Sequence, residues 1–521
     1  MPAKLFITPS LHSALKRIRH PTRCISIWAD AACINQSDLV ERSNQVLHME
    51  RIYREAAQVV IYLGEESDHS EFVPFIVPVA DRTALPKRSK YLDITADALE
   101  YSNPTFEQFT SAWRAFLRRP WFMRLWVIQE AALATTAIAV CGSWAMTLGN
   151  LVSLANRLIG QRQFEGDALR RLQTFNGGRQ LMMMGRVNEL VKSCHPIDML
   201  WLLSRTRRSL SANPVDYLWG VQGFDTPESR SVLSPDYELG IEEVLKRFAK
   251  YFIDKGFGMD MLYYAHVDSW RHGVPSWVPG WATHDDSVYS RFWEVSSASR
   301  PYYFGSVGPA EITLGNDSNI ISVKGRRFGI VDKLGESQRA LLDRINDSPD
   351  DLFESPVRYW IETIEDMLAD TTNQDKTALA VTKWSTLALG APEYELFTHK
   401  TKTLSNAERN NLFTKPIKKS KALDHTYGPW YVGEFLRVAI RTGQSLRLGR
   451  SSQVGVCQVP YGTEIGDDLV LLRGSRVPFV LRRVDDGGWY RVVGPCFVHG
   501  YMGSSKISML DDPFIETFNL I

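Results

Sequence analysis

The strongest hydrophobic pattern lies near the N-terminus, where two short apolar runs enclose an amphipathic segment. Residues 24–29 (CISIWA) and 58–64 (QVVIYLG) are rich in strand-favouring residues, and between them apolar residues from Val46 to Ala56 recur at intervals of three and four. This order predicts a strand, a helix and a second strand, which form a βαβ unit with parallel pairing and a right-handed crossover. Asp30 would stand at the carboxyl end of the first strand, where open α/β sheets usually bind ligands.

The segments that follow extend the pattern. Beyond a variable insert at 65–103, the periodicity predicts a helix at about 104–118 and a second helix with Pro120 in its first turn. A short strand is expected at 136–142. Residues 1–150 are therefore expected to form a small α/β domain.

The amphipathic helix has a recognisable start. Asp38 precedes its first turn and Glu41 follows three residues later, the spacing of a capping box. The simplest function of these two acidic residues is to cap the helix.

The rest of the chain divides into three parts by its pattern. Residues 151–310 are mainly helical, and residues 311–424 mix strands and helices before a basic linker. Residues 425–521 contain a helix and then short strands with Gly, Pro and Asp turns, a spacing typical of a small β-barrel. The predicted fold class is α/β, with a mainly helical middle region and a small C-terminal β-barrel-like domain.

Composition narrows the class of protein. The 521 residues contain 60 Lys and Arg against 59 Asp and Glu, so nothing in the net charge points to nucleic acid or to an anionic membrane surface. With 44% hydrophobic and 11% aromatic residues the chain is globular. The six cysteines are scattered without a CxxC pair, and no secretory or membrane-spanning segment is apparent. We expect a cytoplasmic protein with free thiols.

Several common catalytic motifs are absent from the sequence. There is no P-loop, dinucleotide fingerprint, GxSxG or HExxH motif, so no bound cofactor and no metal ion are expected. The neighbours Cys194 and His195 are not expected to form a thiol site, because the members of such dyads come together in space rather than in sequence.

Two blocks of residues resemble the core signature of the fungal heterokaryon-incompatibility (HET) domain. The matching residues of the first block are Trp28, Asp30, Cys33, Ile34, Asn35, Gln36, Glu41, Arg42, Gln45, Val46, Met49, Ile52, Tyr53, Leu63 and Gly64. Those of the second block are Arg119, Trp121, Phe122, Arg124, Trp126, Gln129 and Glu130.

The resemblance continues further along the chain, with some departures. Residues 275–281 (PSWVPGW) and parts of 466–502 look like elements that accompany the HET domain in its large single-chain members. Val215 stands where the family commonly has Arg, and Gly280 where it commonly has Asp. Family members usually begin with an earlier strand carrying an Ala-Leu-Ser-Tyr-x-Trp-Gly motif, which is not seen here. Either the start is truncated, or this member has lost one wall of its site.

The resemblance also implies a fold and an activity. HET domains look like distant relatives of TIR domains, which have a flavodoxin-like α/β fold, and some TIR domains cleave NAD. Their catalytic Glu lies in a helix, four residues after a Trp in several members, and Trp126 and Glu130 have this spacing. Residues at this spacing share a helix face, so both side chains would border one pocket. Glu130 is the candidate catalytic residue.

The same resemblance suggests how NAD, as a substrate, would be held. Asn35 and Gln36 would offer amide groups to ribose or phosphate, with Arg42 or Arg124 near the diphosphate. The candidate binding residues are Asp30, Asn35, Gln36, Arg42, Arg124 and Trp126.

Each candidate also has a purely structural interpretation. Glu130 is interpretable as a helix-surface acid paired with an arginine, and Trp126 as part of the core. Asn35 and Gln36 are interpretable as ties for the loop backbone. Cys33 is expected to be a small buried hydrophobe rather than a nucleophile.

The resemblance thus implies an intracellular effector of non-self recognition and programmed cell death that acts by self-association, with NAD cleavage as its enzymatic form. The alternative from another class is a non-catalytic TIR-like interaction module, and a third is a structural or regulatory protein that retained the fold. Expected partners are proteins, including further copies of the chain, and not nucleic acid.

Overall fold

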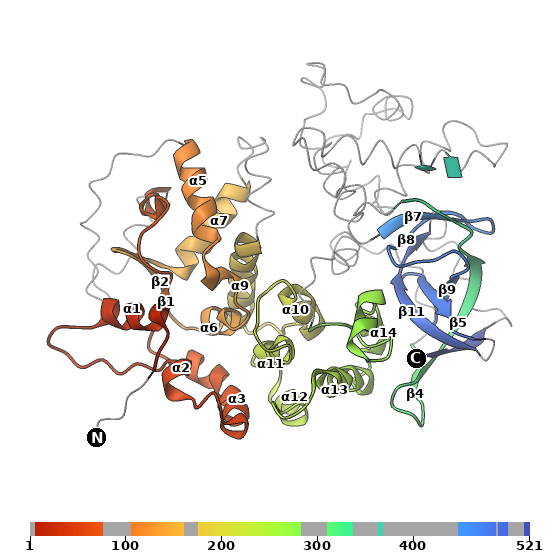
Figure 1. The fold of residues 1–521 in the computed structure, drawn as a ribbon, viewed down its shortest axis with the longest axis horizontal. Helices are drawn as coiled ribbons and strands as arrows, with labels where there is room; N and C mark the ends of the chain where they lie inside the picture. The colour runs from red at the N-terminus through yellow and green to blue at the C-terminus, as the bar shows by residue number, and fades with distance from the viewer. Residues whose placement is uncertain are drawn as a thin grey trace, which may run out of the picture. The chain divides into compact units, whose positions relative to one another are not determined.

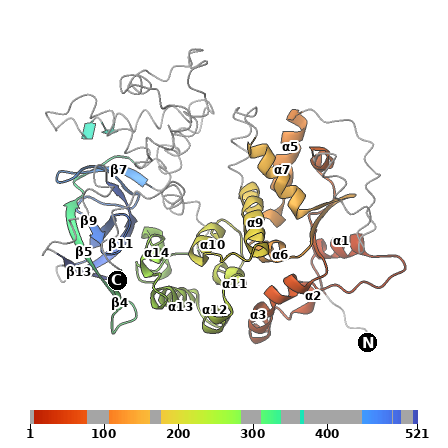
Figure 2. The same cartoon turned by 180° about the vertical axis from the view of Figure 1, so that it is seen from behind.

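The computed structural model describes residues 6–76, 106–160, 176–282, 310–336, 363–364, 366–367, 446–485, 488–498 and 515–521. The chain divides into two compact units (Figures 1 and 2). The first unit is Met1–Val244 with Trp281–Asp285, and the second is Leu245–Gly280 with Asp286–Ile521. The four-part division expected from sequence is finer than this and stays a prediction. The expected insert beyond residue 76 and the basic linker lie outside the described residues.

A three-stranded sheet organises the first unit. Strands β1 (Val59–Tyr62) and β2 (Ala137–Cys141) pair in parallel, and β3 (Trp144–Thr147) follows β2 as an antiparallel neighbour. Between β1 and β2 the described chain forms η1 (Ser70–Ile76), α5 (Phe106–Leu117), η3 (Pro120–Met123) and α6 (Val127–Ala132). The strands predicted at 58–64 and 136–142 are therefore present as a parallel pair with a helical crossover.

Residues 24–29 are not a strand, and the βαβ unit predicted to begin there is wrong. In the described residues the sheet order is β1-β2-β3, and residues 24–29 belong to no sheet. An extended run becomes a strand only when a neighbour takes up its backbone hydrogen bonds, and Ile27, 43% exposed, is not packed as a buried strand residue would be. Asp30 therefore lies at the start of the short helix α2 (Asp30–Cys33) and not at a strand end.

Helices cover both faces of the sheet. Ile18 of α1 (Pro9–Ile18) packs with Val60, Ile138 and Val140 on one face, while α7 (Leu148–Gly160) lies on the opposite side (Figure 1). Since successive residues of a strand point to opposite faces, each strand contributes to both layers.

The helix α3 (Leu39–Glu55) begins as predicted, but its capping box is only half formed. The Oδ1 atom of Asp38 accepts hydrogen bonds from the backbone N–H groups of Val40 and Glu41, at 3.0 and 2.9 Å. The side chain of Glu41 does not return to Asp38. It accepts instead from the backbone N–H of Asn35 at 3.0 Å, and so holds the preceding loop.

Further helices complete the first unit. α9 (Asn176–Lys192) packs closely on α7, since a Cβ added at Gly185 would lie 2.5 Å from a methyl carbon of Val152. Three shorter helices follow: α10 (Met199–Thr206), α11 (Asp216–Gln222) and α12 (Pro227–Val232). α13 (Ile241–Asp254) spans the boundary between the two units in sequence.

The second unit is mainly β. Its short helices are α14 (Gly258–Leu262) and η5 (Val267–His272). One sheet has the order β13-β11-β10-β9-β5-β4, and because β13 also pairs with β5, the strands β5, β9, β10, β11 and β13 form a hydrogen-bonded ring. A second sheet has the order β12-β8-β7-β6. The strands are β4 (Ile312–Leu314), β5 (Ile321–Ile330), β6 (Lys333–Leu334), β7 (Leu446–Ser451), β8 (Gly455–Pro460), β9 (Asp468–Leu472), β10 (Phe479–Arg483), β11 (Trp489–Pro495), β12 (Phe497–Val498) and β13 (Glu516–Leu520).

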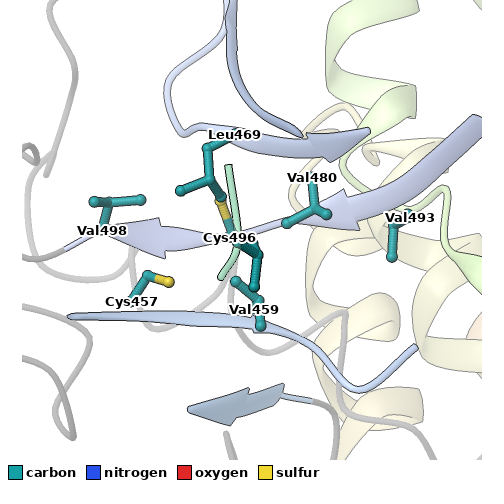
Figure 3. Close-up of a cluster of buried hydrophobic side chains, with 8 residues drawn as sticks. Cys457, Val459, Leu469, Val480, Val493, Cys496 and Val498 are labelled. Atoms are coloured by element: carbon teal, nitrogen blue, oxygen red, sulfur yellow. The ribbon is translucent and has the colours of Figure 1, made fainter. Parts of the chain in front are cut away.

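A cluster of buried aliphatic and cysteine side chains fills this unit (Figure 3). Cys457 and Val459, two residues apart on β8, point toward Cys496. Burial raises the pKa of the Cys457 thiol to about 12, so this thiol stays neutral and packs as a small apolar side chain. The buried members are Val331, Cys457, Val459, Leu469, Val480, Val493, Cys496 and Val498.

Candidate functional site

The predicted site residues come from two stretches of the first unit. Asp30, Asn35 and Gln36 belong to α2 and the loop after it, and Arg42 to the first turns of α3. Arg124, Trp126 and Glu130 belong to α6 and the turn that leads into it. These residues form three groupings, one around Glu130, one in the loop and one around a buried carboxylate from a third stretch.

Glu130 lies in the first turn of α6, on a helix whose neighbouring positions Gln129 and Ala131 are buried. Burial raises the pKa of the Glu130 carboxyl, and the negative charge of Asp30 adds to this effect. The positive charge of Arg124 and a hydrogen bond from the Trp121 indole act in the opposite direction. The structure therefore brings three predicted residues together: Asp30, Arg124 and Glu130.

Tyr53 on α3 borders the same group. Burial raises the pKa of its hydroxyl well above the ordinary tyrosine value, the carboxylates of Glu130 and Asp30 raise it further, and Arg124 opposes them. The ring of Trp28 meets the Tyr53 ring edge to face, with their centroids 5.7 Å apart. Sequence reasoning placed Tyr53 in the apolar stripe of its helix. Two features of the sequence could have indicated a site role for Tyr53. Its side chain adds a hydroxyl group to an otherwise apolar stripe, and the residue belongs to the first signature block.

Asn35 and Gln36 hold the loop to itself. The Oδ1 atom of Asn35 accepts from the Ser37 backbone N–H at 3.2 Å, and the Gln36 side-chain amide donates to the Asp30 carbonyl at 3.4 Å. Both side chains belong to exposed residues. Cys33 is also exposed, so the prediction that it is buried is wrong: it is the last residue of α2, a four-residue helix that has no buried residue.

Arg42 and Trp126 meet at a carboxylate that sequence reasoning missed. Arg42 Nη2 and Trp126 Nε1 both donate to Asp216, the first residue of α11, at 3.3 and 3.2 Å. Ser211 Oγ and the Tyr237 hydroxyl donate to the same carboxylate at 2.9 and 2.7 Å.

The Arg42 guanidinium lies 3.9 Å above the centre of the Tyr237 ring. Burial and the neighbouring carboxylate of Asp216 raise the pKa of the Tyr237 hydroxyl well above its ordinary value. The tyrosine therefore stays protonated and serves as a hydrogen-bond donor.

Arg119, another residue of the second signature block, has a structural role. Arg119 donates to the carbonyls of Leu63 and Glu65, at 2.6 and 3.0 Å, and to the hydroxyls of Ser67 and Ser70. It thereby fixes the loop that leaves the carboxyl end of β1. Gly64 has a φ of +99° there, and a Cβ added to it would lie 3.2 Å from Arg119 Nη1, so both the backbone and the arginine require glycine.

The described ranges contain neither a cluster of metal ligands nor a helix that could span a membrane. Their His, Cys, Asp and Glu side chains form no group of three or more that could hold a metal ion. Among these same residues, no helix combines the length and apolar character that crossing a membrane requires.

Comparison with known proteins relates the N-terminal part of this chain, which carries the site, to one protein family. Residues 2–130 match the family model described as heterokaryon incompatibility protein (HET). Over 387 residues the chain is 24% identical to heterokaryon incompatibility protein 6, OR allele, of Neurospora crassa. That match covers 64% of this chain and 56% of the relative, so the chain spans little more than half the length of the curated relative. No solved structure matches the chain. The resemblance found in the two signature blocks is confirmed for residues 2–130, the part of the chain that matches the HET family model.

Proposed function

We propose that this chain is an effector of the heterokaryon-incompatibility type, in which the HET domain cleaves the N-glycosidic bond of NAD at Glu130. The incompatibility role is supported by the family match and by the name of the Neurospora relative. The catalytic role is supported by one observation. Glu130 lies in the electrostatic reach of Asp30, Arg124 and the Tyr53 hydroxyl, which come from three different elements.

The proposed reaction needs few groups. The bond between C1′ of the nicotinamide ribose and the pyridinium nitrogen breaks, and its electron pair leaves with nicotinamide, which becomes neutral. Water adds to C1′ and releases a proton, so the products are nicotinamide, ADP-ribose and one proton. Because the leaving group is neutral, no general acid is required. A fixed carboxylate stabilises the positive charge that develops on the ribose.

In the proposed reaction, Glu130, Arg124 and Asp30 each have a separate role. Glu130, ionised, faces the ribose and is the catalytic carboxylate. Arg124, whose side chain belongs to an exposed residue, supplies positive charge for the diphosphate. Asp30 stands close enough to Glu130 to raise its pKa. In the proposal it binds the ribose hydroxyls.

The test is NAD consumption by the purified chain over a range of protein concentrations, with nicotinamide and ADP-ribose separated by chromatography. Glu130→Gln keeps the shape of the side chain and removes its charge, so we expect turnover to fall by about 10²- to 10³-fold. Glu55→Gln is the matched control, because Glu55 pairs with Arg51 on the solvent face of α3 and is 64% exposed. Equal turnover in both variants would contradict the catalytic role of Glu130.

A specific observation supports the alternative, a non-catalytic interaction module. Arg42 and Trp126, two of the residues expected to contact NAD, direct their polar atoms to Asp216. If the folded wild-type chain releases no nicotinamide at any concentration but self-associates in sedimentation, the interaction module replaces the enzyme. The protein partners, self-association and cytoplasmic location expected from sequence belong to the proposal in either form.

A further inference from the structure

The carboxylate of Asp216 is the most completely bonded acidic group near the site. Its side chain is 5% exposed. Oδ1 accepts from Arg42 and Tyr237, while Oδ2 accepts from Trp126 and Ser211. These four donors come from four separate segments of the first unit.

Such an arrangement leaves Asp216 little capacity for a ligand. Burying a carboxylate is costly unless hydrogen bonds and an opposite charge compensate it, and here each oxygen has two donors and one of the donors is a guanidinium. The function of Asp216 must therefore lie in the groups that it holds.

Two of these groups belong to the elements that carry the site. Trp126 immediately precedes α6, and its carbonyl accepts the backbone N–H of Glu130 at 3.2 Å. Arg42 lies on α3, the helix that presents Tyr53 to Glu130. A carboxylate on α11 thus binds the start of one helix and the side of the other.

The backbone before Asp216 binds the same turn. The N–H of Leu125 donates to the carbonyl of Leu210 at 3.0 Å, and the N–H of Leu210 donates to the carbonyl of Met123. Gly220 on α11 packs against Leu125, where an added Cβ would lie 3.0 Å from a methyl carbon. The turn that carries Arg124 is therefore held by residues 210–220 from outside the matched HET domain.

We propose that Asp216 is a positioning residue of the HET site, which acts through Trp126 to fix α6 and the Glu130 carboxylate. Its relevance to catalysis rests on the proposed function, but its effect on Glu130 does not require turnover. The HET family match ends at residue 130, so the site is completed by a segment that lies beyond the matched domain.

The experiment compares three near-isosteric variants of the full chain: Asp216→Asn, Trp126→Phe and Tyr237→Phe. Each is made alone and together with Glu130→Gln, and melting temperatures are measured from about pH 4 to about pH 8. The charged and titratable groups around Glu130 are Asp30 of α2, Arg124 before α6 and Tyr53 of α3, and none of them is changed. Tyr237→Phe is the control, because it removes one donor to Asp216 without touching the turn before α6.

The readout is the pH dependence of the effect of Glu130→Gln. The raised pKa means that the proton on Glu130 stabilises the fold below about pH 4.3, and that this contribution is lost as the pH rises through the raised value. Glu130→Gln should therefore gain melting temperature relative to its parent as the pH rises. We expect this gain to shrink in the Asp216→Asn and Trp126→Phe backgrounds, because a loosened α6 lets water reach the carboxylate, and to persist with Tyr237→Phe.

Three outcomes decide the matter. A gain that persists in all three backgrounds would show that Asp216 only stabilises the fold, and would overturn the proposal. If Asp216→Asn does not fold, the same test is made by comparing the gain from Glu130→Gln in the Trp126→Phe background with the gain in the Tyr237→Phe background. NAD turnover measured on the same samples separates the two questions, since its absence in the wild type overturns the proposed reaction and leaves the pH comparison valid.

Discussion

Glu130 is subject to opposing influences, and the balance among them determines its chemistry. Burial and the Asp30 charge favour the neutral acid, whereas Arg124 and the Trp121 indole favour the carboxylate. If Glu130 were simply a surface glutamate paired with an arginine, neither burial nor the charge of Asp30 would raise its pKa. An acid whose pKa is raised by burial and by the charge of a second carboxylate is a common feature of functional sites.

This balance predicts how turnover depends on pH. Only ionised Glu130 stabilises the developing positive charge, so kcat/KM for NAD should rise with pH through a midpoint above about 4.3, the ordinary value for glutamate. Asp30→Asn should lower that midpoint, since it removes a negative charge, and Arg124→Gln should raise it. The measurement is the pH profile of each variant, and a midpoint that is the same in all of them would contradict the assignment.

Arg119 supports a second prediction at this scale. Arg119→Lys keeps the charge but cannot reach two carbonyls and two hydroxyls with one planar group, so the free energy of unfolding of the first unit should fall by about 2–3 kcal/mol. Arg51→Lys is the control. Its partner is Glu55 on an open helix face, and it should change stability by about 0.5 kcal/mol or less. Similar losses in chemical denaturation for both variants would argue against the role of Arg119 in fixing the loop.

At the scale of elements, the sequence pattern predicted those strands and helix ends that depend on residues close together in the chain. β1, β2 and the cap at Asp38 follow from apolar runs and from one side chain next to free N–H groups. The run at 24–29 has the same composition as a strand but no partner among the described residues, because pairing depends on neighbours that periodicity does not reveal. Asp216 was missed for a related reason, since Arg42 lies 174 residues away from it and Trp126 lies 90 residues away.

The ring of strands allows a prediction about one element. Phe518 on β13 is fully buried and meets the Tyr490 ring of β11 edge to face, with centroids 5.1 Å apart. Phe518→Ala should lower the free energy of unfolding of the second unit by about 3–5 kcal/mol, because it leaves a cavity between two strands. Thr517→Ala, at the exposed neighbouring position, should stay within about 0.5 kcal/mol of the wild type in the same denaturation experiment. A small loss for Phe518→Ala would mean that β13 contributes little to the ring.

For the whole molecule, the compact unit around the site is larger than the family domain. The HET match ends at residue 130, whereas the first unit continues to Val244 and includes both Leu210 and Asp216. The first unit has one sheet among its described residues and the second unit has two, and each unit has its own buried residues. A HET domain cut out at its family boundary would therefore lose the Asp216 carboxylate that accepts from Trp126 and Arg42, and the backbone hydrogen bonds between Leu210 and the turn before its last helix.

A cleavage experiment tests this view of the first unit. A protease site inserted between residues 161 and 175, followed by cutting of the folded chain, should leave two pieces that co-elute in gel filtration. The hydrogen bonds that Asp216 accepts from Trp126 and Arg42, and those between Leu210 and the turn before α6, join residues on either side of the cut. Separation of the pieces under native conditions would show that the HET domain is self-contained.

The ring of the second unit also has a consequence for the order of folding during synthesis. Ser322 on β5 donates to Asn519 on β13, at 2.7 Å and across 197 residues of sequence. On a ribosome, β5 emerges long before the strand that pairs with its open edge, and closing so long a loop is slow. During that interval β5 presents an unpaired edge, which invites pairing with other chains. Until residue 520 has been made, pairing with other chains therefore competes with closure of the ring.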